Sequence, residues 1–375
     1  TNACILEGAI LANIGLGEWG PAANMARALQ ELGASSQAGY LALLVEAIAA
    51  EDYALVLETS RDGASDGALL DVLVSAWAEV GLGRMSEATA TLDSLSKTQG
   101  MATFGMYHKA LALASAGDYE GAHAILSDPN QGALQSLRRA VLAHARILSQ
   151  LERNAEALAL LDASFVGEPD PELAQLRLRL AAGEPVPFDS VTSAKEGLAE
   201  VFYTVAMALG QDADATHTLI YARAAQALRP NQDDTALLVA GLLEEQGQHD
   251  LAIEVYATVP ATSPTFHIAE IGRAEANRSA GRTEAAIEIL QGLARAKPDL
   301  LHDLPEHQLA TADDRQLGPQ HGLHRQGITD RQRLHPAQIM ACHVFLRHHQ
   351  HTRRRQQQFN PTARDRPPRG RPVAP

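Results

Sequence analysis

Small and apolar residues recur with a constant step of 34 residues between residues 199 and 300. The recurring positions are the glycines Gly247 and Gly281, the alanines Ala252 and Ala286, and the prolines Pro230, Pro264 and Pro298. A fixed period of roughly 20–50 residues indicates a solenoid, in which each repeat is one supersecondary unit. We therefore expect this stretch to consist of three stacked units of the same kind.

The unit at residues 267–300 shows what each repeat contains. The apolar positions of its two predicted helices are Ile268, Ile271 and Ala274, and then Ala286, Leu290 and Leu293. Gly281 lies between the two helices and tolerates the left-handed conformation that commonly ends a helix. Pro298 follows the second helix and cannot continue it. The spacing predicts a helix, a tight turn and a second helix in each unit.

The first half of the chain repeats more loosely. Gly17, Gly83 and Gly117 occupy turn positions, each followed five residues later by an alanine. Glu152 occupies the turn of a further unit, and the unit around Glu51 is the weakest of all. The sequence thus predicts about eight units, well above the roughly three that a stable stack needs.

A break separates five units in the first half from three in the second. Gly183, Pro185 and Pro187 exclude a continuous helix there. We predict a first block at residues 1–182, a hinge loop at 183–198 and a second block at 199–300. The first block consists of about five degenerate units and one further helix.

Small residues where helices cross, a turn glycine and a terminal proline make the units resemble the tetratricopeptide repeat (TPR) family. Ala274, Gly281, Ala286 and Pro298 carry the resemblance, which is strong only from residue 199 onward. It implies an all-α, right-handed superhelical solenoid of antiparallel helix pairs. The chain is most similar to long, alanine-rich bacterial members of the family. Some of these lose a secretory or lipid-anchoring leader.

Composition agrees with a helical stack. Hydrophobic residues make up 46% of the chain but aromatic residues only 4%, so alanine and leucine must form the core. The only cysteines, Cys4 and Cys342, imply neither a disulfide framework nor a metal cluster. The chain begins at Thr1 without a leader, so we regard it as a fragment or a processed protein. Its location stays open between the bacterial cytoplasm and, with a lost leader, the periplasm or a membrane surface.

Residues 301–375 differ from the rest of the chain. They contain 12 Arg and no Lys, whereas the preceding residues are strongly acidic. The segment is rich in Arg, His, Gln and Pro, and its composition predicts a disordered tail. Arg without Lys, together with many histidines, is also what a GC-rich gene yields out of frame. One hypothesis is therefore that a frameshift product replaces further repeats here.

Short motifs give no cofactor, metal or catalytic site. Residues 15–20 match the dinucleotide pattern GxGxxG, but they follow a helical stretch rather than a strand. The tail histidines lack the fixed geometry of a metal site. Residues 368–372, PRGRP, resemble the core of an AT-hook, which inserts into the minor groove of DNA. We expect nucleic-acid binding to be improbable, and we expect no cofactor and no small-molecule substrate.

Function must then come from the surface of the stack. In the TPR family, the first helix of each pair lines a concave groove that holds a peptide or a partner helix. Carried over by position, the candidate groove residues are Leu73, Trp77, Phe104, Tyr107 and Leu111 in the first block and Tyr203, Met207, Leu237, Ile271 and Glu275 in the second. Alternatively, Trp77 and Tyr107 pack between repeats. The groove lacks the Lys and Asn with which some family members clamp a carboxylate. Glu200 and Asp234 are also placed there by position, so the predicted groove is apolar with an acidic edge and suits an amphipathic helix or a basic peptide.

We expect a non-catalytic scaffold that binds other proteins, either as a peptide or as an amphipathic helix. Two alternatives stay open. The chain is the repeat portion of a larger enzyme whose catalytic domain lies elsewhere, or it binds DNA through its basic tail.

Overall fold

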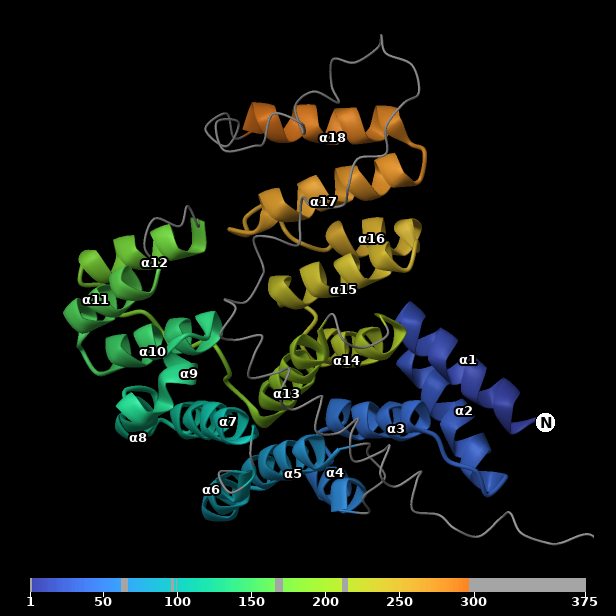
Figure 1. The fold of residues 1–375 in the computed structure, drawn as a ribbon, viewed down its shortest axis with the longest axis horizontal. Coiled ribbons are helices and arrows are strands. Elements are labelled where there is room, and N and C mark those ends of the chain that lie inside the picture. The colour runs from blue at the N-terminus through green and yellow to red at the C-terminus, as the bar shows by residue number, and fades with distance from the viewer. Residues whose placement is uncertain are drawn as a thin grey trace, which may run out of the picture.

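The structure is a computed structural model, and it describes residues 2–61, 67–95, 98, 100–165, 171–210 and 215–296. These residues form 18 α-helices and no strand (Figure 1). The all-α prediction is therefore confirmed. The predicted tail at 301–375, with its AT-hook-like segment, lies outside the described residues, as does Pro298.

The first block consists of successive helix pairs. Their bounds are α1 (Ala3–Leu16) with α2 (Trp19–Glu31), α3 (Gln37–Ala49) with α4 (Tyr53–Arg61), α5 (Ala68–Gly81) with α6 (Met85–Ser94), α7 (Ala102–Ser115) with α8 (Tyr119–Leu126), and α10 (Arg138–Gln150) with α11 (Asn154–Ser164). The short elements η2 (Pro129–Gln131) and α9 (Gly132–Gln135) precede α10, and α12 (Pro171–Ala181) follows α11. Each pair packs against the next, as expected for a solenoid.

The second block repeats the arrangement three times. Its pairs are α13 (Ala194–Leu209) with α14 (Ala215–Leu228), α15 (Asp233–Glu245) with α16 (His249–Tyr256), and α17 (Phe266–Ser279) with α18 (Thr283–Ala296). Helix α13 begins at Ala194, because Ser193 caps it by accepting a hydrogen bond from the Glu196 amide. The end of the predicted hinge at 183–198 is thus already helical.

Turns with a left-handed residue join the two helices of the pairs. Gly17, Gly83, Gly117, Gly247 and Gly281 all have φ between 71° and 88°. The amide of Gly281 donates to the Arg278 carbonyl, and the next amide donates to the Asn277 carbonyl, as in a Schellman motif. The glycine period in the sequence therefore reports the turn geometry directly.

The two weakest sequence units have the same turn without a glycine. Glu51 and Glu152 have φ of 58° and 60°, and they are the only described non-glycine residues with positive φ. Their turns also form both backbone hydrogen bonds of the motif. The degenerate units are therefore structurally complete, and the surrounding helix pair imposes the turn.

The two blocks are not separate bodies. Helix α13 packs against α3, α5 and α7, and α14 packs against α1 and α3. One continuous hydrophobic core extends from Ile10 in α1 to Ala276 in α17. A second, smaller core lies between α10, α11 and α12 and includes Val186 of the connecting segment. Figure 1 shows α10–α12 and α15–α18 as two arms that extend from the shared body.

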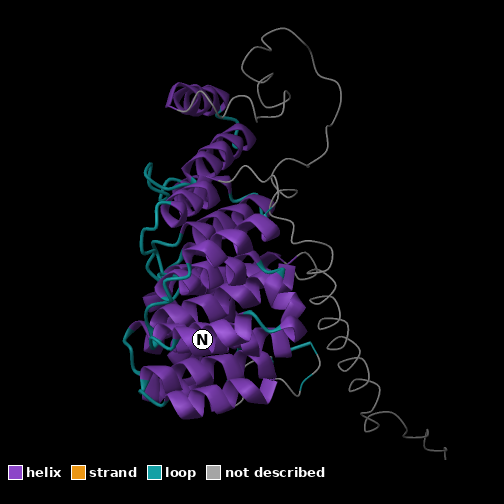
Figure 2. Cartoon of the chain, turned by 90° about the vertical axis from the view of Figure 1, so that its left-hand side faces the viewer, coloured by secondary structure: helices purple, strands orange, loops and turns teal. Residues whose placement is uncertain are grey.

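Seen from the side, most of the helices are stacked in layers, one above another (Figure 2). The segment between α12 and α13 is anchored in this stack, because Val186, Phe188 and Val191 are buried. No helix in the part of the chain that the structure describes is long and apolar enough to cross a lipid bilayer.

Candidate partner-binding surfaces

Four of the five candidate groove residues of the first block lie inside the molecule. Leu73, Trp77 and Leu111 are fully buried, and Tyr107 is 5% exposed. Helix α13 covers them. A Cβ atom added at Gly197 of α13 would lie only 2.2 Å from the Trp77 ring. These side chains therefore pack against the second block, and their groove is filled by a helix of the same chain.

A buried carboxylate fixes α13 in this position. Glu200 is 1% exposed, and its Oε1 accepts hydrogen bonds from the Tyr107 hydroxyl and from Arg139 Nε, both at 2.8 Å. Arg139 Nη2 donates to the other carboxylate oxygen at 2.5 Å. Burial alone would raise the pKa of the Glu200 carboxyl, but the Arg139 charge and its hydrogen bonds hold the pKa below its usual value.

Arg139 connects this contact to the next pair of helices. Its Nη1 donates to Asp234 at the start of α15, at 2.5 Å. The guanidinium group also lies 4.3 Å from the centre of the Tyr203 ring, at the distance of a cation–π contact. One arginine of α10 thus contacts α13 and α15 together. We call Tyr107, Arg139, Glu200, Tyr203 and Asp234 the interblock clamp.

A second polar contact lies behind the clamp. Trp77 Nε1 donates to His108 Nδ1 at 3.0 Å, and both side chains are fully buried. Burial lowers the pKa of His108 to about 4, so the imidazole is neutral near pH 7. A neutral acceptor suits the indole N–H, and the pair has a structural role between α5 and α7.

The candidate groove residues of the second block are partly accessible. Tyr203 and Leu237 are buried at 9% and 6% exposure. Met207, Ile271 and Glu275 are of intermediate exposure, as is Phe104 on α7. We call Phe104, Met207, Ile271 and Glu275, together with Gly241 on α15, the inner-curve surface. A Cβ added at Gly241 would meet no atom within 4 Å, so the helix surface there is open.

The carboxylates near this surface are already paired. Glu275 forms an ion pair with Arg278 on its own helix, and Asp234 pairs with Arg139. The acidic edge expected from the sequence is therefore largely neutralised within the molecule. Apolar contact is left as the main property of the inner-curve surface.

Sequence reasoning missed the clamp. Glu200 was expected to face the groove, and Arg139 was not singled out at all. One signal was available in hindsight. Glu200 is the only charged residue in the sequence from Gly197 to Gly210, and its immediate neighbours Ala199 and Val201 are apolar. A carboxylate in such surroundings needs a buried partner.

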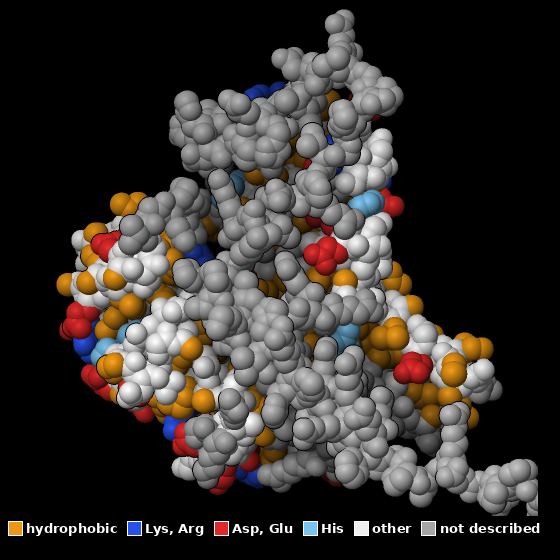
Figure 3. Space-filling model, in the orientation of Figure 1, with side chains coloured by type: hydrophobic (Ala, Val, Ile, Leu, Met, Phe, Trp, Pro, Cys, Tyr) orange, Lys and Arg blue, Asp and Glu red, His pale blue; other side chains and the backbone are white. Residues whose placement is uncertain are grey.

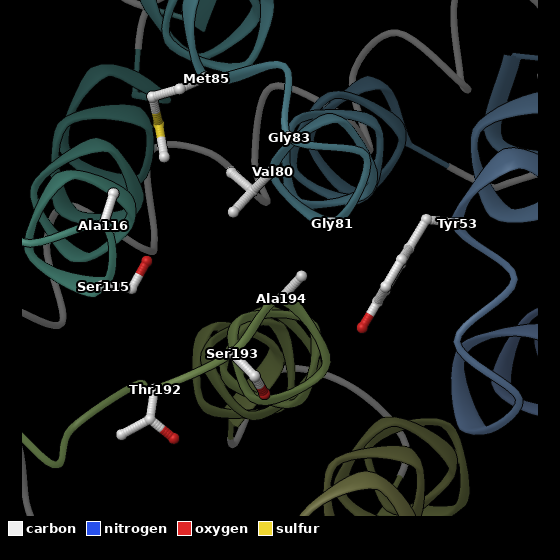
Figure 4. Close-up of a pocket in the computed structure, with 10 residues that line it drawn as sticks. All are labelled: Tyr53, Val80, Gly81, Gly83, Met85, Ser115, Ala116, Thr192, Ser193 and Ala194. Carbon is white, nitrogen blue, oxygen red and sulfur yellow. The ribbon is translucent and has the colours of Figure 1, made fainter.

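An open depression lies at the junction of the two blocks (Figure 4). It has a volume of about 460 Å³ and is bordered by Tyr53, Ser115, Thr192 and Ser193, with glycine and apolar residues between them. None of its lining residues is a carboxylate, histidine, lysine or cysteine. The lining therefore offers hydroxyl groups without a neighbouring carboxylate, histidine or lysine that would act as their base.

Metal-ligating side chains do not cluster in the part of the chain that the structure describes. No group of three or more His, Cys, Asp or Glu side chains suited to a metal ion occurs among the described residues. Two histidines do meet between α8 and α10, where His123 Nδ1 lies 2.9 Å from His144 Nε2. Burial lowers the pKa of both, that of His144 to about 4, so both rings are neutral near pH 7. A hydrogen bond between two neutral rings explains the contact.

Exposed apolar side chains gather at one end of the stack. Apolar atoms are concentrated over α1 at the right-hand side of the space-filling view (Figure 3). Ile5 is 66% exposed and Leu16 is 54% exposed, and both lie on α1. Leu178 on α12, in the arm formed by α10–α12, is 71% exposed.

Comparison with known proteins adds little to the geometry. No family model matches the chain, and no curated protein matches it. Among solved structures, a chain from the "Structure of Naa15/Naa10 bound to HypK-THB" aligns with 17% identity and a TM-score of 0.32. The match covers 73% of this chain and 55% of that chain, so this chain spans about half of its length. At this TM-score the alignment assigns neither a family nor a function.

Proposed function

We propose that the chain is a non-catalytic scaffold of TPR type that holds a partner protein on the inner-curve surface. The observation that carries this proposal is the placement of α13. Because α13 fills the groove of the first block, the inner-curve surface is the part of the predicted groove that stays accessible. Its residues lie on α7, α13, α15 and α17, which are first helices of their pairs.

The chemistry of this surface favours an amphipathic helix. Met207 and Ile271 present apolar atoms of intermediate exposure, and Gly241 leaves room for a close approach. The apolar face of a partner helix would bury these groups, as in other helix-in-groove complexes. A basic peptide is the weaker choice, since Asp234 and Glu275 already pair with arginines of this chain.

Site-specific photocrosslinking in the native host tests the proposal. A photoreactive amino acid placed at Ile271 of the full chain should capture a partner, whereas the same group at Leu55 should not. Leu55 is 46% exposed and lies on α4, outside the inner-curve surface. The captured segment, made as a labelled peptide, should then bind the purified protein in solution.

Substitutions separate binding on this surface from nonspecific adhesion. Ile271→Asp should weaken binding of the labelled peptide about tenfold or more, as expected when an apolar anchor is replaced by a charge. The control Leu55→Asp should leave the affinity unchanged. Equal affinity for both variants would show that the partner binds elsewhere and would refute the proposal.

A further inference from the structure

The stack is held together by one repeated contact, in which the second helix of a pair packs on the first helix of the next pair. The contact between α16 and α17 shows it clearly. Tyr256 of α16 is 3% exposed and lies directly against Gly272 of α17, where an added Cβ would come within 2.4 Å of the ring. A first helix therefore has a face that is complementary to the preceding second helix.

On α1 this face has no cover. Ala269 and Ala276 share the helix face of Gly272, at spacings of three and four residues, and all three residues are buried. Counted back from the left-handed turn glycine, the same positions in α1 are Ile5, Gly8 and Ala12. All three are exposed, and a Cβ added at Gly8 would meet nothing within 4 Å. The comparison identifies the apolar surface of α1 as a stacking face.

The same three positions behave alike in the other first helices. None of their side chains is exposed in α3, α5, α7, α10 or α15. The exposed positions of α1 are therefore not a general property of first helices in this molecule. They arise because no described second helix packs on that side of α1.

The last helix of the described residues, α18, shows the complementary situation. Leu290 occupies the position of Tyr256 in α16, and it is of intermediate exposure. The equivalent residues of other second helices are at most 3% exposed, namely Ala26 at 1%, Leu92 at 1%, Leu126 at 3% and Leu161 at 0%. The side chain at this position is thus buried in the other second helices and partly exposed in α18.

We propose that a second copy of this chain covers these two faces, with α1 of one copy packed on α18 of the next. Within the described residues, α1 and α18 each offer the surface that the other lacks, and the new contact continues the one between α16 and α17. Helix α1 is apolar on all sides and carries a single charged side chain, Glu7, which favours burial against another helix. Such a head-to-tail contact is heterologous, so it builds rings or open chains of copies.

Two variants, each with one of the two stacking faces disrupted, test the contact by sedimentation velocity on the full chain. Ile5→Glu charges the α1 face, and Leu290→Gln makes the α18 face polar. The average mass of the wild-type protein should rise with concentration, and each variant alone should stay monomeric. A 1:1 mixture of the two variants should form a dimer and nothing larger, because only one intact α1 face and one intact α18 face then meet.

Controls keep the result interpretable. Leu178→Glu changes an equally apolar, more exposed residue on α12 and should assemble like the wild type. Gly8→Gln is a second block of the α1 face at a site with free space, and circular dichroism verifies that each variant folds. The proposal is overturned if the wild type stays monomeric at all concentrations. It is equally overturned if either blocked variant assembles alone or if their mixture stays monomeric.

Discussion

At the scale of single residues, the turn positions show how the structure tolerates an imperfect repeat. Most turns between paired helices have glycine, for which a positive φ has no steric cost. Glu51 and Glu152 adopt the same conformation although a side chain disfavours it by roughly 1–2 kcal/mol. The packing of the two helices on each side supplies the free energy that holds these residues in place.

Replacing Glu51 by glycine should therefore stabilise the protein. The substitution relieves the left-handed strain, and part of the gain is lost to the greater chain entropy of glycine. We expect the free energy of unfolding to rise by about 0.5–1 kcal/mol, measured by chemical denaturation. The converse change, Gly117→Ala, should lower it by about 1 kcal/mol, since Gly117 has φ of 88°. A loss of stability in the Glu51→Gly variant would contradict this account.

Gly197 is required for a different reason, namely close packing. Its added Cβ would lie 2.2 Å from the Trp77 ring, which is fully buried and has no room to move. Gly197→Ala should destabilise the protein by about 1–3 kcal/mol through overpacking. Gly241→Ala is the matched control, because it also lies within a helix but has open space, so better helix propensity should make it neutral or stabilising. Equal effects of the two changes in denaturation experiments would exclude a steric role for Gly197.

At the scale of elements, pairs of helices are connected by buried neutral histidines. His108 accepts a hydrogen bond from Trp77 between α7 and α5, and His144 contacts His123 between α10 and α8. Charged groups near the second pair are Arg153, Glu120 and Glu156. Burial is the main reason why the pKa values of His108 and His144 fall to about 4. These contacts require the uncharged rings.

The protein should accordingly lose stability in mild acid. In the unfolded chain histidine takes up a proton near pH 6.5, whereas His108 and His144 in the folded protein do so only near pH 4. The unfolded state therefore binds more protons between pH 6.5 and 4, and stability falls as pH is lowered through this window. The loss should be on the order of 3 kcal/mol for each residue. Thermal melting as a function of pH measures it, and His108→Gln should make the decline shallower; an unchanged decline would contradict the assignment.

At the scale of the whole molecule, the second block lies against the groove of the first. This arrangement turns what would be an open coil into a body with one shared core and two arms. The interblock clamp joins α7, α10, α13 and α15 at the point where the arms diverge. It therefore sets the relation between the blocks and, through it, the shape of the inner-curve surface.

Breaking the clamp on one side should be costly. Glu200→Leu leaves the Arg139 charge without its buried partner, and such changes typically destabilise a protein by about 3–5 kcal/mol. Replacing both residues, as Glu200→Leu with Arg139→Met, should recover much of this loss because no buried charge is then left unpaired. Asp234, which also pairs with Arg139, is 45% exposed and can be solvated by water. A double-mutant cycle in denaturation experiments measures the coupling. Additive effects of the two single changes would show that the pair does not act as a unit.

The sequence by itself determined the local architecture. Glycine and alanine at a step of 34 residues predicted the helix pairs, their turns and the all-α class, because helix ends and helix crossings impose strict local requirements. It also placed the first helices, and with them Met207 and Ile271 of the inner-curve surface. The sequence did not predict which of these positions are accessible, since Leu73, Trp77 and Leu111 follow the same pattern and are buried.

Only the tertiary structure decided how the two blocks meet. The contacts of Glu200 with Tyr107 and Arg139 join residues 93 and 61 positions apart, and no local rule links such distant positions. A periodic sequence specifies how each helix packs against its immediate neighbours in the stack. Which groove is filled from within, and which stacking faces stay uncovered, depends on the path of the whole chain.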